Sequence, residues 1–247
     1  MPRPAPALLA ALALPAVAGL PAAAATIDFD DIEAGSSLSD LGGGVTVTAF
    51  NASDDAPGSA VAYDFDGHPE LAYGGQQAPF DGGGNVAAGT DLGNGIAIQG
   101  PDAFRILEFR RPAGHLRFDF AEPIGAFGFT VVDVEGPSEF TTDTGYFVAA
   151  FSGGEEVLRV DFADLVTPGS AHFDPSVAFG NNTANRIAAF SAELAGAASF
   201  DSAIVALGGS GVVDEVVTTE AAVVPTPAAA GAGLVVLAGL AARRRRA

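Results

Sequence analysis

The feature that most constrains the fold of this chain is a regular alternation of apolar and polar residues. In the stretch HLRFDFA, Leu116, Phe118 and Phe120 alternate with Arg117 and Asp119. A period of two places the apolar side chains on one face of an extended strand and the polar ones on the other. The stretch therefore predicts a half-buried β-strand.

Short apolar runs of this kind recur along the chain, separated by clusters of Gly, Pro, Asn and Asp. They are TIDFD, VTVTAF, AVAYDF, GIAIQ, FRILEF, AFGFTVVDV, GYFVAAFS, EVLRVDFA, RIAAFSA, DSAIVAL and GVVDEVVT. Roughly a dozen short strands with such turns predict an all-β fold, and we expect a single β-sandwich. The 18 Phe residues supply side chains for its inner faces, and VDFADLV is long enough for one helical turn.

Glycine and proline mark the expected turns. AEPIG contains Pro123 and Gly125 between two of the runs, which predicts a hairpin or a close crossover. The glycine-rich stretches Leu41–Gly44 and Phe80–Asn85 lack the Lys and Ser/Thr that follow a phosphate-binding loop, so they predict flexible turns. The long polar segment 67–93 predicts an insertion that is either functional or mobile.

The N-terminus has the pattern of a secretory signal. Arg3 supplies a positive charge, Ala7–Leu20 is apolar, and Ala23 and Ala25 supply the two small residues of a cleavage site. This predicts a signal peptide at 1–25 and an exported protein. The alternative is a short N-terminal anchor, although polar residues follow at once and the run is short for a membrane span.

The predicted mature body, 26–220, is strongly acidic. It holds all 30 Asp and Glu of the 247 residues but only six of the 11 Arg, and the chain has no Lys. Such a charge repels phosphate backbones, which excludes nucleic acid as a partner. It also repels itself, and bound divalent cations would relieve that repulsion. The other interpretation is a solubilising surface suited to a salty medium.

The residues give no support for catalysis. No Cys is present, so disulfides, thiolate metal sites and a cysteine nucleophile are excluded. His68, His115 and His172 lie far apart and share no ligand spacing, which argues against zinc. A G-x-S-x-G motif is absent, and without Trp the aromatic sugar platforms usual in glycosidases are scarce. We therefore expect a protein that is not an enzyme.

Calcium is the ligand that the residues favour most, although an EF-hand is excluded. Asp64, Asp66 and Gly67 resemble part of a D-x-D-G calcium loop. In the EF-hand register, however, Ala62 and Tyr73 would occupy ligand positions, and neither can serve there.

Acidic residues also gather in the first and last predicted strands of the body. If these strands are neighbours, their carboxylates meet at one edge, where hard oxygen ligands suit Ca²⁺. The alternative is that they are solvated, outward-facing residues of alternating strands. The predicted calcium ligands are Asp28, Asp30, Asp31, Glu33, Asp214 and Glu215.

The C-terminal segment 221–247 combines three parts in a fixed order. A Val-Pro-x-Pro box precedes the apolar run Ala228–Ala242, whose 15 residues span about 23 Å as a helix, less than the ~30 Å hydrocarbon core. We predict a short hydrophobic helix held transiently in the inner membrane, with the arginines on the cytoplasmic side. The alternative is a permanent anchor. The motif residues are Val224, Pro225, Thr226, Pro227, Arg243, Arg244, Arg245 and Arg246.

Signal peptide, acidic β-rich body and tail together resemble the exported PEP-CTERM proteins, in particular those with a VPLPA-type sorting signal. Thr226 stands where that box usually has Glu or Leu. The body is also similar to bodies of this family, in TIDFDDIEAGSSLSDLGGGVTV, in the loop from His68 to GIAIQ with Glu70, in LRFDFAEPIGAFGFTVVDVE and in VVDEV. The resemblance implies a jelly-roll or lectin-like sandwich.

The resemblance also implies recognition by an exosortase, a membrane-embedded sorting enzyme of Gram-negative bacteria, and processing near the Pro-x-Pro. We therefore expect a non-catalytic protein of the cell surface or extracellular matrix, associated with exopolysaccharide and biofilm. One alternative is a secreted carbohydrate-binding module, with Tyr63 or Tyr73 in contact with sugar. Another is a secreted hydrolase, which only the number of acidic residues supports.

Overall fold

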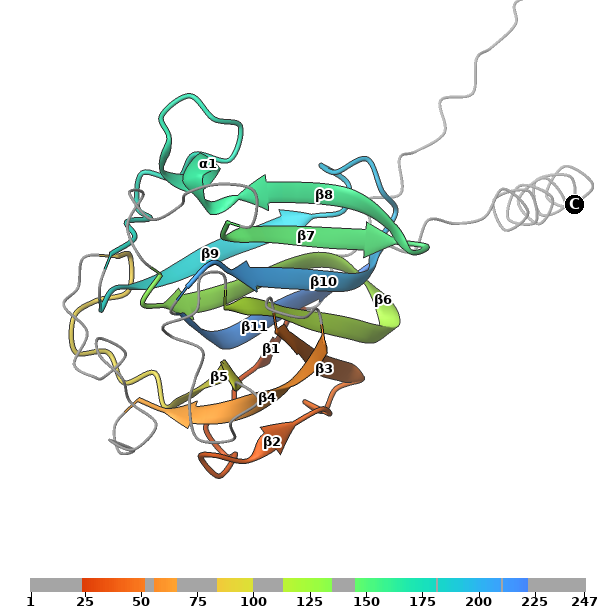
Figure 1. Ribbon diagram of the computed structural model, residues 1–247. Helices are drawn as coiled ribbons and strands as arrows, with labels where there is room; N and C mark the ends of the chain where they lie inside the picture. Colours follow the sequence, from red (N-terminus) through yellow and green to blue (C-terminus); the bar gives the residue numbers. More distant parts are fainter. Residues whose placement is uncertain are drawn as a thin grey trace, which may run out of the picture. The chain divides into compact units, whose positions relative to one another are not determined.

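A computed structural model describes seven stretches of the chain, all within one compact unit, Ala22–Ala222. Just over half of the described residues lie in strands, and the helix among them has five residues (Figure 1). The fold is all-β, as the alternating pattern predicts. The described residues are 24–51, 56–65, 84–99, 113–134, 145–180, 182–209 and 211–221.

The predicted runs within these stretches all form strands, and VDFADLV forms the short helix; FRILEF lies outside the described residues. In chain order the elements are β1 (Ala24–Ile27), β2 (Ser37–Leu38), β3 (Val45–Asn51), β4 (Ala56–Asp64), β5 (Asn94–Gln99), β6 (Gly114–Val132), β7 (Phe147–Ser152), β8 (Glu155–Asp161), α1 (Phe162–Val166), β9 (Ala184–Ser191), β10 (Phe200–Leu207) and β11 (Val212–Glu220).

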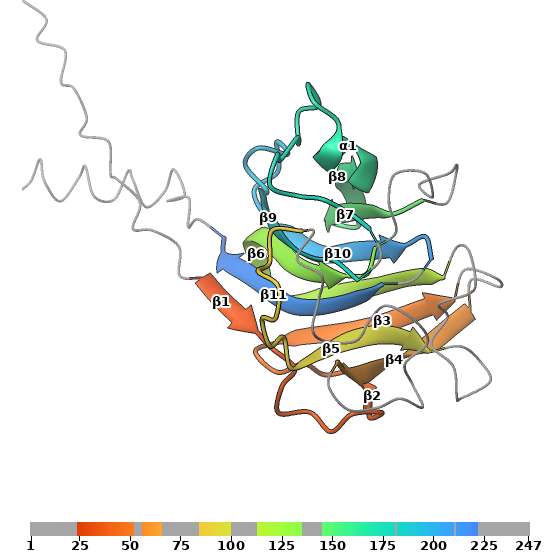
Figure 2. The same cartoon turned by 90° about the vertical axis from the view of Figure 1, so that its left-hand side faces the viewer.

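The longest strand, β6, organises the sheet because its two halves have different neighbours. The first half pairs with β3 and β10, and the second half pairs with β11 and β9, all antiparallel. Following hydrogen-bonded neighbours from β6 through β3, β4, β5 and β11 leads back to β6, so these five strands close a barrel-like ring. Strands β7 and β8 extend the sheet beyond β10, and β1 adds to β11 (Figures 1 and 2).

The bend of β6 lies where the sequence predicts a turn, and that prediction is wrong. The strand continues through Pro123 and Gly125 without reversing direction. The reason is a change of partners: Phe120 is the last residue paired with β3, and Ile124 is the first paired with β11. Pro123 has no partner in the described ladders, so its missing N–H breaks no pairing.

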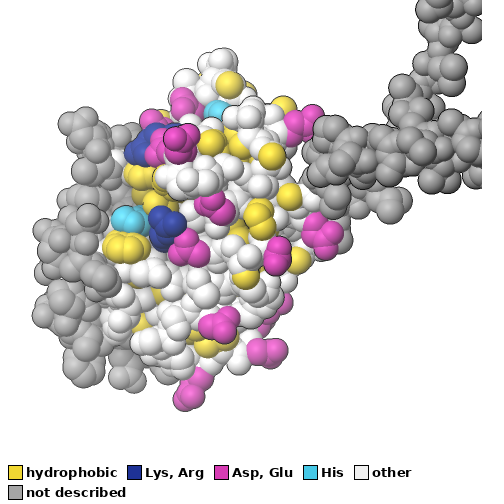
Figure 3. All heavy atoms as spheres, turned by 90° about the vertical axis from the view of Figure 1, so that its right-hand side faces the viewer, with side chains coloured by type: hydrophobic (Ala, Val, Ile, Leu, Met, Phe, Trp, Pro, Cys, Tyr) yellow, Lys and Arg dark blue, Asp and Glu magenta, His cyan; other side chains and the backbone are white. Residues whose placement is uncertain are grey.

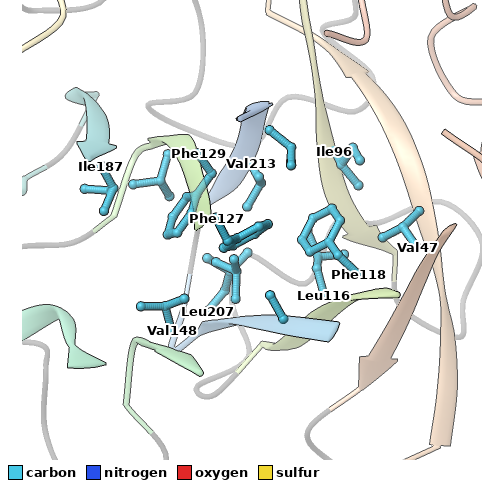
Figure 4. Packing of buried hydrophobic residues seen from close by; sticks show 14 of the residues in the cluster. Val47, Ile96, Leu116, Phe118, Phe127, Phe129, Val148, Ile187, Leu207 and Val213 are labelled. Atoms are coloured by element: carbon cyan, nitrogen blue, oxygen red, sulfur yellow. The ribbon is translucent and has the colours of Figure 1, made fainter. Parts of the chain in front are cut away.

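Bending brings the two halves of β6 face to face across the hydrophobic core. Leu116 and Phe118 come from the first half, and Phe127 and Phe129 from the second (Figure 4). The ring centroids of Phe118 and Phe127 are 5.6 Å apart, as are those of Phe127 and Phe129. Each of these four side chains is at most 2% exposed. The alternation that predicts a strand thus also supplies both walls of the core.

The described sheet has two edge strands on the side away from the ring. Strand β8 pairs only with β7, and β9 pairs only with β6 among the described strands. The chain between them consists of α1 and an irregular segment that leads to β9. This open side contrasts with the closed ring formed by β3, β4, β5, β6 and β11.

Candidate functional site

The first and last strands of the body are neighbours, as the calcium prediction requires. β1 pairs antiparallel with β11, with Ala24 opposite Thr219 and Ile27 opposite Val216. The turn after β1 then carries Asp30 to the start of β5, next to the middle of β11. The acidic residues of both predicted groups therefore lie in one region of the molecule.

Asp30 is fixed by the backbone at the start of β5. Its Oδ1 accepts a hydrogen bond from the Asn94 N–H at 3.1 Å, and the Asn94 amide donates to the carbonyl of Ile32 at 2.8 Å. Gly93 permits this approach, because a Cβ at that position would lie 1.8 Å from Asp30 Oδ1. In the described structure the carboxylate is thus held by a neutral backbone N–H.

Asp214 and Glu215 occupy an irregularity in β11. The register shifts between Asp214 and Val216, and Glu215 has a positive φ of 25°, so an extra residue is accommodated opposite β6. Asp214 is 2% exposed. The Glu215 carboxylate accepts a hydrogen bond from Thr130 Oγ1 at 3.3 Å and lies 3.3 Å from Arg186 Nε on β9.

The position of Asp214 changes its acidity. The pKa of its carboxyl is raised to about 7, mainly by burial, and the negative charges of Glu215 and Asp30 act in the same direction. A hydrogen bond from the Glu215 N–H and the positive charge of Arg186 act in the opposite direction, with smaller effect than burial. The carboxyl is therefore close to half-protonated at neutral pH in the metal-free protein.

The remaining predicted calcium ligands lie in the same segment as Asp30. Asp28, Asp31 and Glu33 are exposed in and beside the turn after β1. Within the described stretches, no three His, Asp or Glu side chains are placed to hold a metal ion together. The structure thus brings Asp30, Asp214 and Glu215 together, and calcium binding stays a prediction.

The histidines and tyrosines do not form a site in the described residues. His115 stacks on Phe50 at 4.7 Å, and His172 lies edge-on to Phe190 at 5.9 Å. Tyr63, expected as a sugar contact, is 0% exposed on β4 and packs against Phe65. That expectation is wrong, because both faces of β4 are buried here and Tyr63 packs into a second core cluster with Val61 and Phe65.

Several predicted features lie outside the described residues. They include the signal peptide up to residue 23, His68, Tyr73 and the whole sorting motif. Among the residues that the structure describes, no helix has the length and apolar character needed to cross a membrane.

A groove of about 430 Å³ opens on the side where β8 and β9 form edges. One wall is β9, which contributes five consecutive residues, Ile187–Ser191. The other wall is the irregular segment from Ala171 to Val177, and Leu158 and Leu165 contribute from β8 and α1. The groove therefore lies where the described strands leave the core least covered.

Two unusually exposed apolar side chains line this groove. Leu194 is 91% exposed and Phe173 is 38% exposed, and they are the only exposed large hydrophobic residues in the described part of the chain. An exposed apolar cluster beside a hollow is typical of an interaction site. We name the hollow lined by β9, residues 171–177, Leu194 and Ala195 the β9 groove.

Sequence reasoning missed the β9 groove because nothing local distinguishes it. RIAAFSA correctly predicts a strand, but strand order, not sequence, decides that β9 lies at an edge. The one available signal was Leu194, a large apolar residue in the small, turn-like stretch AELAG. Neither a family model nor a curated protein matches this chain.

Proposed function

We propose that this chain is an exported protein of the cell surface or extracellular matrix, without catalytic activity, that an exosortase-type enzyme sorts through its C-terminal signal. Association with exopolysaccharide and a transient stay in the inner membrane are part of this proposal. So is the narrower fold assignment, a jelly-roll or lectin-like sandwich. The support for sorting comes from the order of Val224–Pro227, the apolar run and Arg243–Arg246.

The structural observation that supports the proposal most is the pairing of β1 with β11. The predicted cleavage site after Ala25 lies within β1, and the last strand ends at Glu220, four residues before the Val-Pro-x-Pro box. Removal of both flanking segments leaves the ring and the core intact. Cleavage after Ala25 removes half of β1 and keeps Thr26 and Ile27, which pair with Val217 and Val216.

Mass spectrometry of the protein isolated from its native envelope tests this proposal. We expect a mature N-terminus near Thr26 and a C-terminus near Pro227. A variant in which Pro225 and Pro227 are replaced by Ala is expected to keep its tail. An intact Arg243–Arg246 cluster in the native protein would instead indicate a plain anchor.

Carbohydrate binding by the body is a second candidate, which the outer face of the sheet favours. The half-buried rings of Phe50, Phe147 and Phe151 lie on β3 and β7, with polar groups between them. Arg159 lies 3.6 Å from the centre of the Phe147 ring, and Arg117 lies 5.8 Å from that of Phe151. Figure 3 shows arginine side chains beside apolar and acidic ones on this part of the surface. Rings for stacking beside hydrogen-bonding groups suit a sugar.

A glycan array with the full chain tests the second candidate. Binding that Phe50→Ala and Phe151→Ala weaken, while the control Ser37→Ala on the exposed part of β2 leaves it unchanged, would support it. An array without any bound glycan would leave the non-binding surface protein as the better proposal.

A further inference from the structure

The outer edge of β9 already accepts strand-like hydrogen bonds from another part of the chain. The Arg186 N–H donates to Asn85 Oδ1 at 2.7 Å, and Asn85 Nδ2 donates to the Arg186 carbonyl at 2.9 Å. The Val86 N–H donates to the Ala184 carbonyl at 3.2 Å. The side-chain amide of Asn85 thus takes the place of a peptide group, and residues 84–86 act as a short neighbouring strand.

The part of the β9 edge that residues 84–86 cover ends where the β9 groove begins. In the described part of the chain, residues 84–86 form hydrogen bonds with this edge at Ala184 and Arg186, whereas from Ile187 to Phe190 the strand borders the hollow. At the end of β9, the Ser191 carbonyl accepts a hydrogen bond from the Ala195 N–H at 3.2 Å. An uncovered strand edge offers N–H and C=O groups to a further strand. The groove is therefore the continuation of an edge at which the protein already binds amide groups, through two hydrogen bonds with the Asn85 side chain and one with the Val86 backbone.

Apolar side chains line the groove beside this edge of β9. Leu158, Leu165 and Ile187 connect the floor of the groove to the hydrophobic core. Phe173 and Leu194 stand at its exposed margin. In a strand laid along β9, every second side chain points the same way, so apolar residues at alternate positions would enter the groove.

The charged residues around the groove favour an occupant with positive charge. Its lining contains one carboxylate, Asp174, and no arginine, and Glu193 directly precedes Leu194. The chain as a whole has a formal net charge of −19. A basic segment is attracted to this surface, whereas a second copy of the chain would bring the same acidic surface against it.

We propose that the β9 groove binds an extended polypeptide strand of a partner protein, with apolar side chains at alternate positions and Lys or Arg between them. The strand adds to the edge of β9 beyond Arg186, in line with residues 84–86. This goes beyond the proposed function, which assigns the body no protein partner. It stands whether or not the tail is sorted.

Fluorescence anisotropy with labelled peptides and the full chain tests the proposal. The probe is a nonapeptide of alternating Lys and Val. Two matched peptides carry N-methyl groups, one on the Val amides and one on the Lys amides. Because alternate N–H groups of a strand point to opposite sides, one methylated peptide is expected to bind about tenfold more weakly or worse and the other nearly unchanged.

The protein variant Leu194→Asp separates groove binding from charge attraction. We expect this variant to bind the probe peptide about tenfold more weakly, because it loses an apolar contact. The added negative charge alone would have the opposite effect and strengthen binding of a cationic peptide. Thr46→Asp, on an exposed site of β3, is the control and should bind no more weakly than the native chain.

Three results would overturn the proposal. The first is no binding of the probe at about 1 mM, a concentration that detects even weak association. The second is that both methylated peptides bind equally well and that Leu194→Asp binds the probe as tightly as the native chain. Charge attraction alone would then explain the binding. The third is a dimer in sedimentation experiments that Leu194→Asp dissociates, which would assign the groove to a second copy.

Discussion

At the scale of single residues, Asp214 is the most informative position. A carboxyl that is 2% exposed and lies beside Glu215 and Asp30 is more easily protonated than one in water. Its pKa of about 7 in the folded chain compares with about 4 in an unfolded one. The folded state therefore binds this proton more tightly than the unfolded state.

We predict that this carboxyl makes folding stability fall as the pH rises. Its contribution is fully present below about pH 4 and is lost as the pH rises through about 7, with a total on the order of 4 kcal/mol at most. Denaturant unfolding in EDTA at pH 5 and pH 8 measures the effect. Asp214→Asn should flatten this part of the pH dependence and be the more stable protein at pH 8.

Comparison of the two proteins isolates Asp214, because the other carboxylates titrate in both. Glu155→Gln, on an exposed residue of β8, should keep the native pH dependence. If Asp214→Asn keeps it too, the carboxyl is not the buried acid described above.

Gly93 gives a second prediction at this scale. Gly93→Ala should destabilise the protein by about 2–4 kcal/mol, because a Cβ would clash with Asp30 Oδ1 and φ is +61°. Gly89→Ala is the matched control: φ is +75° but no atom lies within 4 Å, so about 1 kcal/mol is expected. Equal losses in urea unfolding would contradict the close approach to Asp30.

At the scale of elements, β6 carries most of the architecture. Its first half faces its second half across the core, and four other strands pair with it. Phe127 lies at the meeting point, with ring centroids of Phe118, Phe120 and Phe129 at 5.6, 5.9 and 5.6 Å. A change at this position therefore affects both halves at once.

We predict that Phe127→Ala lowers the free energy of unfolding by about 3–5 kcal/mol, because it leaves a cavity between the two halves of β6. Leu194→Ala removes a comparable apolar side chain that is 91% exposed, and its effect should stay within about 0.5 kcal/mol. Urea unfolding measures both. Similar losses for the two variants would contradict the assigned core.

At the scale of the whole molecule, the predicted calcium site links the first and last strands of the body. Bound between the turn after β1 and the irregularity in β11, it would tie the start of the body to its end and hold Asp214 ionised. We predict that EDTA lowers the melting temperature by about 5–10 °C relative to calcium at 100 times its Kd.

Asp30→Asn should abolish the effect of EDTA, and Glu155→Gln should preserve it. An unchanged melting temperature in the native protein after chelation would reject the calcium site. The raised pKa of Asp214 would then be the property of this region that matters at neutral pH.

The sequence predicts more about the fold of this protein than about its candidate site. The alternation in HLRFDFA and its counterparts is local, so strands and fold class could be predicted, as could the turn of α1. The continuation of β6 through Pro123 as one bent strand could not, because it depends on which strands lie beside each half. The burial of Tyr63 could not be predicted for a related reason, because tertiary packing covers both faces of β4.

The sequence by itself determined the all-β class, the acidic charge and the chemistry available, because composition and a two-residue period are properties of neighbouring residues. Only the tertiary structure decided that Asp30 lies near Asp214, that five strands close a ring and that β9 keeps an open edge above a groove. These features arise from pairings between segments as far apart as β1 and β11, and no local pattern encodes which strands meet.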